Sequence, residues 1–205
     1  MSRPRSGTAV LRKGRDRVQS VLDAATAILI ADGYAGFSAR KVATRAGVRL
    51  GHLQYYFPTK QDVVRALLER YLARASASVG DRIAAEPTPA RRLDAVLDVI
   101  LADQRDADTA RFFWELWALA ARDTAVASAM QAFYRGYWKT VVAALLDVQP
   151  GLGRPRAERR AALVIAMLEG LTLFRSRTAS RDLPLPFLER ELRDVARKLA
   201  TDLGT

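Results

Sequence analysis

Basic and polar side chains gather around a short glycine turn in the first third of the chain. Arg40 and Lys41 precede the tripeptide Ala46-Gly47-Val48, and Arg45 and Arg49 flank it. Glycine tolerates the left-handed backbone that a tight turn requires, and guanidinium and ammonium groups bind phosphates and base edges. This spacing predicts a surface that could contact a nucleic acid.

Two short helices are needed to hold these side chains in place. The first is expected at residues 39–45, where Phe37 is followed by the hydroxyl of Ser38 as the N-cap and Gly47 ends the helix. The second is expected at residues 49–57 and ends at Pro58. Val42, Val48 and Leu53 would form a small core between them, with Ala43 allowing a close crossing. The pattern predicts a helix-turn-helix, whose second helix enters the major groove of DNA.

The same stretch holds a longer run of motif positions. They are Ala27 to Asp32, Gly33-Tyr34, Phe37-Ser38, Val42-Ala43, Ala46-Gly47-Val48, Gly51, Leu53, Tyr55 and Phe57-Pro58-Thr59-Lys60. In this order and spacing they resemble the N-terminal signature of the TetR family over roughly residues 15–65. The resemblance implies an all-α fold of about nine helices: a three-helix DNA-binding domain and a helical ligand-binding and dimerisation domain.

The resemblance also assigns residues to DNA contacts. It implies that the second short helix reads the major groove through Arg49, Leu50, His52 and Gln54, that Tyr55, Tyr56 and Lys60 meet sugar and phosphate, and that Ser38 bonds a phosphate beside the first short helix. Arg40 and Lys41 belong to the same expected set. Arg49 departs from the family pattern, which usually has serine or threonine there, so the usual helix cap is expected to be lost.

Some of these positions have a second interpretation. His52 could equally be a solvent-facing residue without a base contact. Tyr55 and Tyr56 are adjacent, so their side chains diverge by about 100° on a helix. We therefore expect one tyrosine to pack inward against the first helix and the other to face outward.

The distribution of charge supports a polyanionic partner for the first part of the chain. The net charge is +11, and residues 1–79 hold 14 basic and 5 acidic residues, against 19 and 17 in residues 80–205. Nucleic acid and an anionic membrane surface both fit this excess. Residues 1–14, with Arg3, Arg5, Arg12 and Lys13, are expected to be a disordered basic arm that gives nonspecific electrostatic help.

Apolar residues recur at helical spacing along the rest of the chain. Helices are expected at residues 18–31, ended by Gly33, after Pro58 up to about Leu72, and at residues 90–104, 108–121, 124–147, 156–178 and 186–202. The proposed organisation is an arm at 1–14, a DNA-binding domain at 15–62 and an effector-binding and dimerisation domain at 63–205. The stretch 80–89, with one glycine and two prolines, is the best candidate for a boundary.

Aromatic side chains are dense on two consecutive expected helices of the second domain. The predicted ligand-binding residues are Phe113, Trp114, Trp117, Tyr134, Tyr137, Trp138 and Glu169. Aromatic faces with a carboxylate suit an apolar or cationic ligand, although aromatics at this spacing are more often ordinary core. Glu115 and Glu169 lie in apolar stretches, so each should have a partner: an arginine such as Arg111, Arg122 or Arg175, a ligand, or solvent.

The last two expected helices carry the stripes that the resemblance assigns to a dimer interface. These stripes are Leu163, Ile165, Met167, Leu168, Leu171 and Phe174, and then Leu188, Leu192, Val195 and Leu199. A twofold dimer places two recognition helices about 34 Å apart on a palindromic site. The resulting hypothesis is a repressor that leaves its operator when a small molecule tilts the helix after Pro58.

Several other classes of protein are disfavoured. The chain has no cysteine and a single histidine, so we expect no metal site, no cofactor and no enzyme, and pairs such as Asp106/Asp108 and Glu189/Glu191 are interpreted as solvated. The lack of cysteine, signal peptide and long apolar run favours a cytoplasmic protein without membrane contact. The alternative that remains is a sequence-neutral basic nucleic-acid-binding protein.

Overall fold

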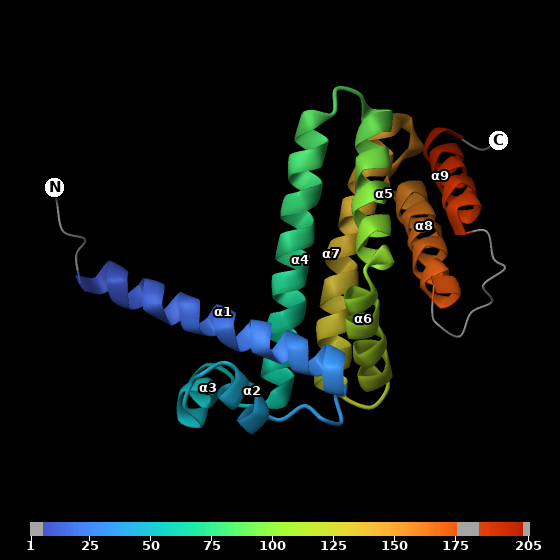
Figure 1. The fold of residues 1–205 in the computed structure, drawn as a ribbon. Helices are drawn as coiled ribbons and strands as arrows, with labels where there is room; N and C mark the ends of the chain where they lie inside the picture. The colour runs from blue at the N-terminus through green and yellow to red at the C-terminus, as the bar shows by residue number, and fades with distance from the viewer. Residues whose placement is uncertain (1–5, 176–184, 203–205) are drawn as a thin grey trace. The chain divides into compact units, whose positions relative to one another are not determined.

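The computed structural model describes the backbone of residues 6–175 and 185–202, and the side chains from Gly14 onward within these ranges. In this part of the chain the regular elements are all helical, which confirms the all-α prediction (Figure 1). They are α1 (Ser6–Asp32), α2 (Ala39–Arg45), α3 (Leu50–Tyr56), α4 (Lys60–Ala85), α5 (Pro89–Arg105), α6 (Ala107–Ala120), α7 (Thr124–Val148), the 3-10 turn η1 (Pro150–Leu152), α8 (Arg154–Arg175) and α9 (Leu185–Thr201). Residues 176–178 of the helix expected at 156–178 lie outside the described residues.

Local signals set most of the helix ends. Gly33 and Gly47 have φ angles of 64° and 66°, a conformation that glycine adopts without strain, and they follow α1 and α2. Ser38 caps α2 by accepting the backbone N–H of Lys41. At the start of α5, Thr88 is the N-cap and Pro89 lies in the first turn. Caps and turn residues therefore place these ends close to the expected positions.

The N-terminal end of α1 differs from the expectation. The helix begins at Ser6, whereas order was expected only from about Arg15. Ala9, Leu11 and the long basic side chains that follow are good helix formers, and a single glycine at position 14 is tolerated inside a helix. The part of the expected disordered arm that is described is thus helical, and Arg3 and Arg5 lie outside the described residues.

The described helices fall into two compact units. One comprises Met1–Arg70 and Arg111–Met130, and the other Tyr71–Ala110 and Gln131–Thr205. The stretch 80–89 lies inside the second unit, where α4 passes through Gly80 and ends at Ala85. A lone glycine costs a helix about 1 kcal/mol relative to alanine. The helical residues on both sides of Gly80 can offset this cost.

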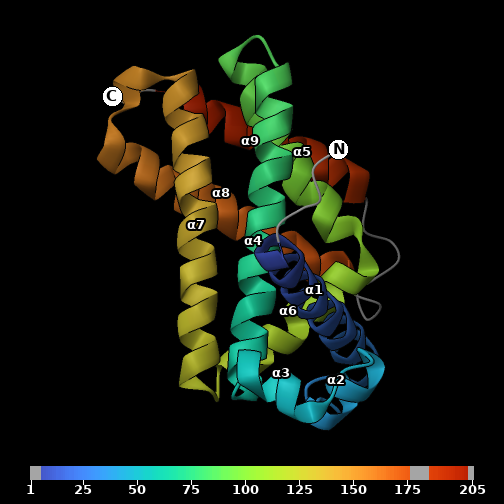
Figure 2. The same ribbon diagram turned by 90° about the vertical axis from the view of Figure 1, so that its left-hand side faces the viewer.

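The first unit has a core built from α1 to α4. Leu29, Phe37, Val42 and Leu53 are almost completely buried, and α2 packs against both α1 and α3 (Figure 2). Arg70 of α4 joins α1 through Asp23, with 2.6 Å between guanidinium and carboxylate. These contacts fix the direction in which α3 presents its outer face.

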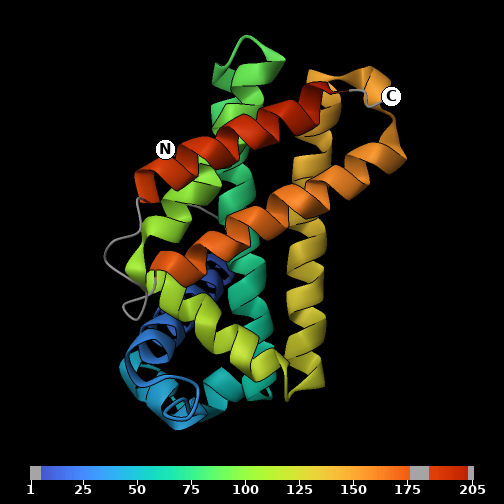
Figure 3. The same ribbon diagram turned by 90° about the vertical axis from the view of Figure 1, so that its right-hand side faces the viewer.

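The second unit is organised around the pair α8 and α9, which run side by side (Figure 3) and both pack against α5. Leu97, Leu101, Leu145, Leu168 and Ala196 are fully buried in its core. Glu189 corrects an expectation, because it is buried where a solvated position was predicted. In the part of the chain that is described, no helix is long and apolar enough to cross a membrane.

Candidate functional site

The helix-turn-helix is closed by hydrogen bonds along its turn. The Ser38 hydroxyl accepts the Lys41 N–H at 3.2 Å, and the Val48 N–H donates to the Ala43 carbonyl at 3.0 Å. Val42 is completely buried and Leu53 is 1% exposed. The turn and its small core therefore hold α2 and α3 in one fixed relation.

The outer face of α3 is polar and open to solvent. His52, Gln54 and Tyr55 are exposed, Tyr55 to 81%, while Leu50 is half-buried at the start of the helix. Arg49 is the N-cap residue and is exposed, and its side chain makes no capping bond. The predicted loss of the usual cap is confirmed. With Tyr56 at the end of α3, the structure thus brings six of the predicted DNA-contacting residues onto one short segment.

The two tyrosines at the end of α3 diverge, but neither is buried. Tyr56 remains 42% exposed, and its ring meets the ring of Tyr55 edge-on at a centroid distance of 5.2 Å. A Cβ placed on Gly14 of α1 would lie 3.4 Å from the Tyr56 hydroxyl. Tyr56 therefore lies against α1 and Tyr55 faces outward, as expected, although Tyr56 stays partly exposed and does not enter the core.

The remaining predicted contacts surround α3. Arg40 and Lys41 are exposed on α2, and the Lys41 ammonium lies 3.1 Å from the Asp32 carboxylate. Lys60, at the start of α4, lies half-buried over the ring of Tyr34, with Nζ 5.0 Å from the centroid. Lys41 and Lys60 are thus partly held by protein groups, whereas Arg40 is open to solvent.

Glu115 of α6 binds the backbone just after α1. Its Oε2 accepts the Tyr34 N–H at 2.8 Å, and a Cβ on Gly33 would lie 3.1 Å from both carboxylate oxygens. The expectation that Glu115 has a partner is confirmed, but the partner is a backbone N–H group and not one of the arginines considered. The sequence gives no signal for this contact because the two residues are 81 positions apart.

A second long-range bond joins α4 to the start of α7. The Gln61 amide donates to Asp123 Oδ2 at 2.7 Å, and the other oxygen of Asp123 accepts the N–H groups of Ala125 and Val126. The hydrogen bond from Gln61 and those from the backbone lower the pKa of Asp123. Asp123 therefore caps α7 and binds α4 at the same time, a role that was not predicted.

The predicted ligand-binding residues are divided between the two units. Phe113, Trp114 and Trp117 lie together on α6 in the first unit, with 5.3 Å between the two indole centroids and 6.3 Å between Phe113 and Trp117. Trp114 is 38% exposed. These three side chains form one aromatic group on a half-buried face of α6.

The other four residues lie in the second unit. The Tyr134 hydroxyl donates to Glu169 Oε2 at 3.2 Å, and the rings of Tyr134 and Tyr137 stack with centroids 6.3 Å apart. Burial raises the pKa of Glu169 to about 7, although the bond from Tyr134 acts in the opposite direction. The Trp138 side chain does not join Tyr134 and Glu169, since its indole N–H donates to the Glu158 carbonyl at 3.0 Å. Tyr134, Tyr137 and Glu169 therefore form a group, and Trp138 belongs to the core.

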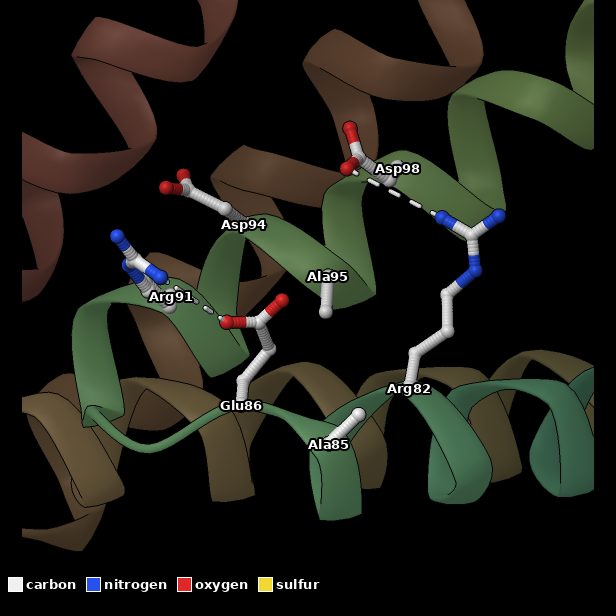
Figure 4. A pocket seen from close by; sticks show the side chains of 7 residues that line it. All are labelled: Arg82, Ala85, Glu86, Arg91, Asp94, Ala95 and Asp98. Atoms are coloured by element: carbon white, nitrogen blue, oxygen red, sulfur yellow. Dashed lines mark ion pairs between the residues drawn. The ribbon is translucent and has the colours of Figure 1, made fainter.

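A charged hollow lies between the end of α4 and the start of α5 (Figure 4). Its volume is about 360 Å³, and it is lined by Arg82, Ala85, Glu86, Arg91, Asp94, Ala95 and Asp98. Each of its carboxylates already pairs with an arginine: Glu86 with Arg91, Asp94 with Arg197, and Asp98 with Arg82 and Arg193. The hollow shares no residue with the predicted ligand site.

The all-helical fold and the exposed polar face of α3 define a helix-turn-helix protein. Comparison with known proteins agrees. Residues 21–67 match the model of the bacterial regulatory proteins of the tetR family. Residues 89–201 match the C-terminal domain of BetI-type transcriptional repressors. The chain therefore belongs to the TetR family of transcriptional regulators, as its sequence motifs indicated, and this family is one of DNA-binding regulators and not of enzymes.

Three similar proteins illustrate the relationship. An HTH-type transcriptional regulator from the dhlA 5′ region of Xanthobacter autotrophicus is 27% identical over 158 residues, 76% of this chain and 74% of that protein. The transcriptional repressor KstR of Mycobacterium tuberculosis is 38% identical over 80 residues, only 39% of this chain and 36% of KstR. The crystal structure of a transcriptional regulator from Rhodococcus sp. Rha1 has a TM-score of 0.70 at 26% identity and covers 89% of this chain and 95% of that one.

Proposed function

We propose that the protein is a dimeric repressor that binds a palindromic DNA operator and leaves it when a small molecule binds the effector domain at residues 63–205. The observation that carries this proposal is the outer face of α3, which offers hydrogen-bonding side chains on a helix held by a buried turn. Neither α2 nor α3 contains an acidic residue. This face therefore suits the negatively charged major groove.

Individual roles follow from side-chain chemistry. Arg49 can bind the O6 and N7 atoms of a guanine with two hydrogen bonds, and Gln54 can bind an adenine in the same way. Ser38, Tyr55, Tyr56 and Lys60 supply phosphate and sugar contacts, helped by the helix N-termini behind Ser38 and Lys60. Arg40 and Lys41 add charge along the phosphate backbone, and His52 and Leu50 complete the face.

Dimerisation is supported by apolar side chains left open on α8 and α9. Leu163 and Leu173 are each 56% exposed, and Phe187 is 51% exposed. Phe174 and Val195 are exposed as well. Covering such side chains with a second copy removes apolar surface from water, and twofold symmetry would pair two α3 helices with two half-sites.

Release by a ligand is supported by helices that contribute residues to both units. The division between the units falls within α4, α6 and α7. Glu115 and Asp123, at the first-unit parts of α6 and α7, bind Tyr34 and Gln61 beside the helix-turn-helix. A ligand that shifts any of these helices would disturb those bonds, and a coupling of about 1–3 kcal/mol is enough for a switch.

The first experiment measures binding of the full-length protein to the DNA upstream of its own gene and to random DNA of equal length at physiological salt. A repressor should prefer the upstream DNA by about 1000-fold or more. Arg49→Ala should weaken only this specific binding, by roughly 10- to 100-fold. The matched control Arg74→Ala removes one exposed arginine of α4 outside the helix-turn-helix and should leave the preference intact.

Equal binding to both DNAs would favour the alternative of a sequence-neutral basic protein. That alternative also predicts that Arg49→Ala and Arg74→Ala have the same small effect, because both would remove one nonspecific charge. A strong preference that depends on Arg49 but not on Arg74 would exclude it.

A further inference from the structure

Glu169 of α8 is a carboxylate without a cationic partner in an aromatic setting. Its carboxylate accepts a hydrogen bond from the neutral Tyr134 hydroxyl at 3.2 Å, and no lysine or arginine among the described side chains forms an ion pair with it. Glu189, a buried carboxylate of the second unit, has two arginines, whereas Glu169 is half-buried. Within the described residues, the charge of Glu169 is therefore not balanced by a cationic side chain.

Tyr137 supplies a second unsatisfied group beside Glu169. Its hydroxyl is buried and has no hydrogen-bond partner within the described residues. Burial, followed by the negative charge of Glu169, raises the pKa of Tyr137 well above its ordinary value. A buried hydroxyl without a partner costs free energy. A bound ligand could supply the hydrogen bond that the described part of the chain does not.

Aromatic rings surround these two groups. Tyr137 contacts Tyr134 at 6.3 Å and Phe133 at 6.4 Å between centroids. On α4, Tyr71 lies 5.7 Å from Phe133, and its hydroxyl donates to Asp103 of α5 at 2.7 Å. Within the described residues, the titratable groups around Glu169 are thus Tyr134 and Tyr137 of α7, Tyr71 of α4 and, beyond Tyr71, the carboxylates Asp103 and Asp106. All of them are neutral or acidic.

We propose that Glu169, Tyr134 and Tyr137 bind an organic ammonium ion that carries at least one N–H group, and that this ion is the effector. A carboxylate next to aromatic faces attracts a cation both by charge and through the rings. The Glu169 carboxylate and the Tyr137 hydroxyl oxygen would each accept an ammonium N–H. The role as effector rests on the proposed function, whereas binding of the cation does not.

Binding of such a cation should depend on pH. The pKa of Glu169 is raised to about 7 by burial, and the cation binds the ionised carboxylate while an alkylammonium stays protonated near neutrality. Affinity is therefore full above this pKa and falls below it, by about tenfold between pH 8 and pH 6. Binding at pH 6 should release protons, because the bound cation ionises Glu169.

The test titrates the full-length protein with butylammonium chloride by calorimetry at pH 8 and pH 6, in two buffers of different ionisation enthalpy. 1-Butanol and butyrate have the same chain without the positive charge, and tetramethylammonium has the charge without an N–H group. We expect butylammonium to bind at least tenfold more tightly than these three, with proton release at pH 6. Equal binding of 1-butanol, or no binding of butylammonium, would overturn the proposal.

Two variants locate the site. Glu169→Gln should fold at least as well as the parent, because it removes a buried charge, and should lose at least tenfold in butylammonium affinity together with its pH dependence. Tyr137→Phe should lose affinity and keep the pH dependence. Glu191→Gln, on the exposed side of α9, is the control. Binding unchanged in Glu169→Gln would refute this site.

DNA binding is measured separately, so that the two proposals can fail independently. If butylammonium binds through Glu169 and lowers operator affinity, both proposals stand. If it binds through Glu169 without affecting operator affinity, the site stands and the effector role is refuted. If the protein does not prefer its operator, the proposed function fails whatever the calorimetry shows.

Discussion

Glu189→Gln should destabilise the second unit strongly. The Glu189 side chain is only 12% exposed and lies between two arginines. Arg175, itself 9% exposed, has its Nη2 atom 2.5 Å from Glu189 Oε1, and Arg105 donates to both carboxylate oxygens. Glutamine keeps the shape but removes the charge, which leaves the guanidinium of Arg175 buried beside a neutral amide.

The magnitude follows from the burial of the two arginines. Removing one partner of a buried ion pair typically costs about 3–5 kcal/mol. Glutamine can still accept one hydrogen bond, and Arg175 retains its bond to the Leu101 carbonyl at 3.2 Å, so the lower end of about 3 kcal/mol is expected. Arg105 is 55% exposed, so the loss of its ion pair with Glu189 should contribute no more than about 1 kcal/mol to the destabilisation.

The assay is urea unfolding followed by circular dichroism at one fixed protein concentration, since dimerisation would add to the apparent stability. The control Glu191→Gln lies two residues away on the exposed side of α9 and should change stability by about 0.5 kcal/mol or less. If the two variants lost similar stability, Glu189 would not be compensating a buried charge and the reasoning would be refuted.

The same carboxylate gives a pH signature. Burial alone would raise the pKa of Glu189, but the hydrogen bond and charge of Arg105 and the charge of Arg175 outweigh it and lower this pKa. The stabilisation is therefore present above the unfolded-state pKa of about 4.3 and is lost as pH falls toward the lower folded-state value. The difference in stability between parent and Glu189→Gln should narrow in that acidic range and be constant between pH 6 and pH 8.

Two further predictions concern single side chains. Arg49→Ser should restore the missing cap of α3 and raise the free energy of unfolding by about 1 kcal/mol. The same change should weaken operator binding. A variant that is no more stable in urea unfolding would show that the missing cap does not limit the stability of α3. Gln104 has both amide atoms buried without a partner in the described part of the chain, so Gln104→Leu should raise the free energy of unfolding by about 1–3 kcal/mol, and a loss measured by urea unfolding would mean that the amide is satisfied.

Local signals explain which parts of the fold were predictable. Gly33, Ser38, Gly47 and Pro58 act on their own neighbours, and they placed the C-terminal end of α1 and both ends of α2 and α3 within a residue or two. Gly80 does not end α4, because a single glycine flanked by strong helix formers is tolerated inside a helix. The assignment of DNA contacts stays a prediction, since exposure on α3 agrees with it but does not test it.

Long-range pairing explains what the sequence could not reveal. Glu189 and Glu191 look alike in their local context, yet one meets Arg105, 84 positions earlier, and the other faces solvent. Glu115 was recognisable as a carboxylate that needed a partner, but that partner is a backbone group of Tyr34, which no residue type marks. Such contacts depend on how the helices pack, and that packing is a property of the whole chain.

The pairing of charges around the helix-turn-helix strengthens the case for a phosphate partner. Three of the five acidic residues in positions 1–79 are already held by cations: Asp23 by Arg70, Asp32 by Lys41 and Asp62 by Arg65. Arg40, Arg45 and Arg49 are exposed and form no ion pair within the described residues. Three uncompensated guanidinium groups on and beside two short helices repel one another, and phosphates on the DNA backbone relieve that repulsion while releasing counterions. The excess charge is therefore concentrated where a DNA strand would meet it.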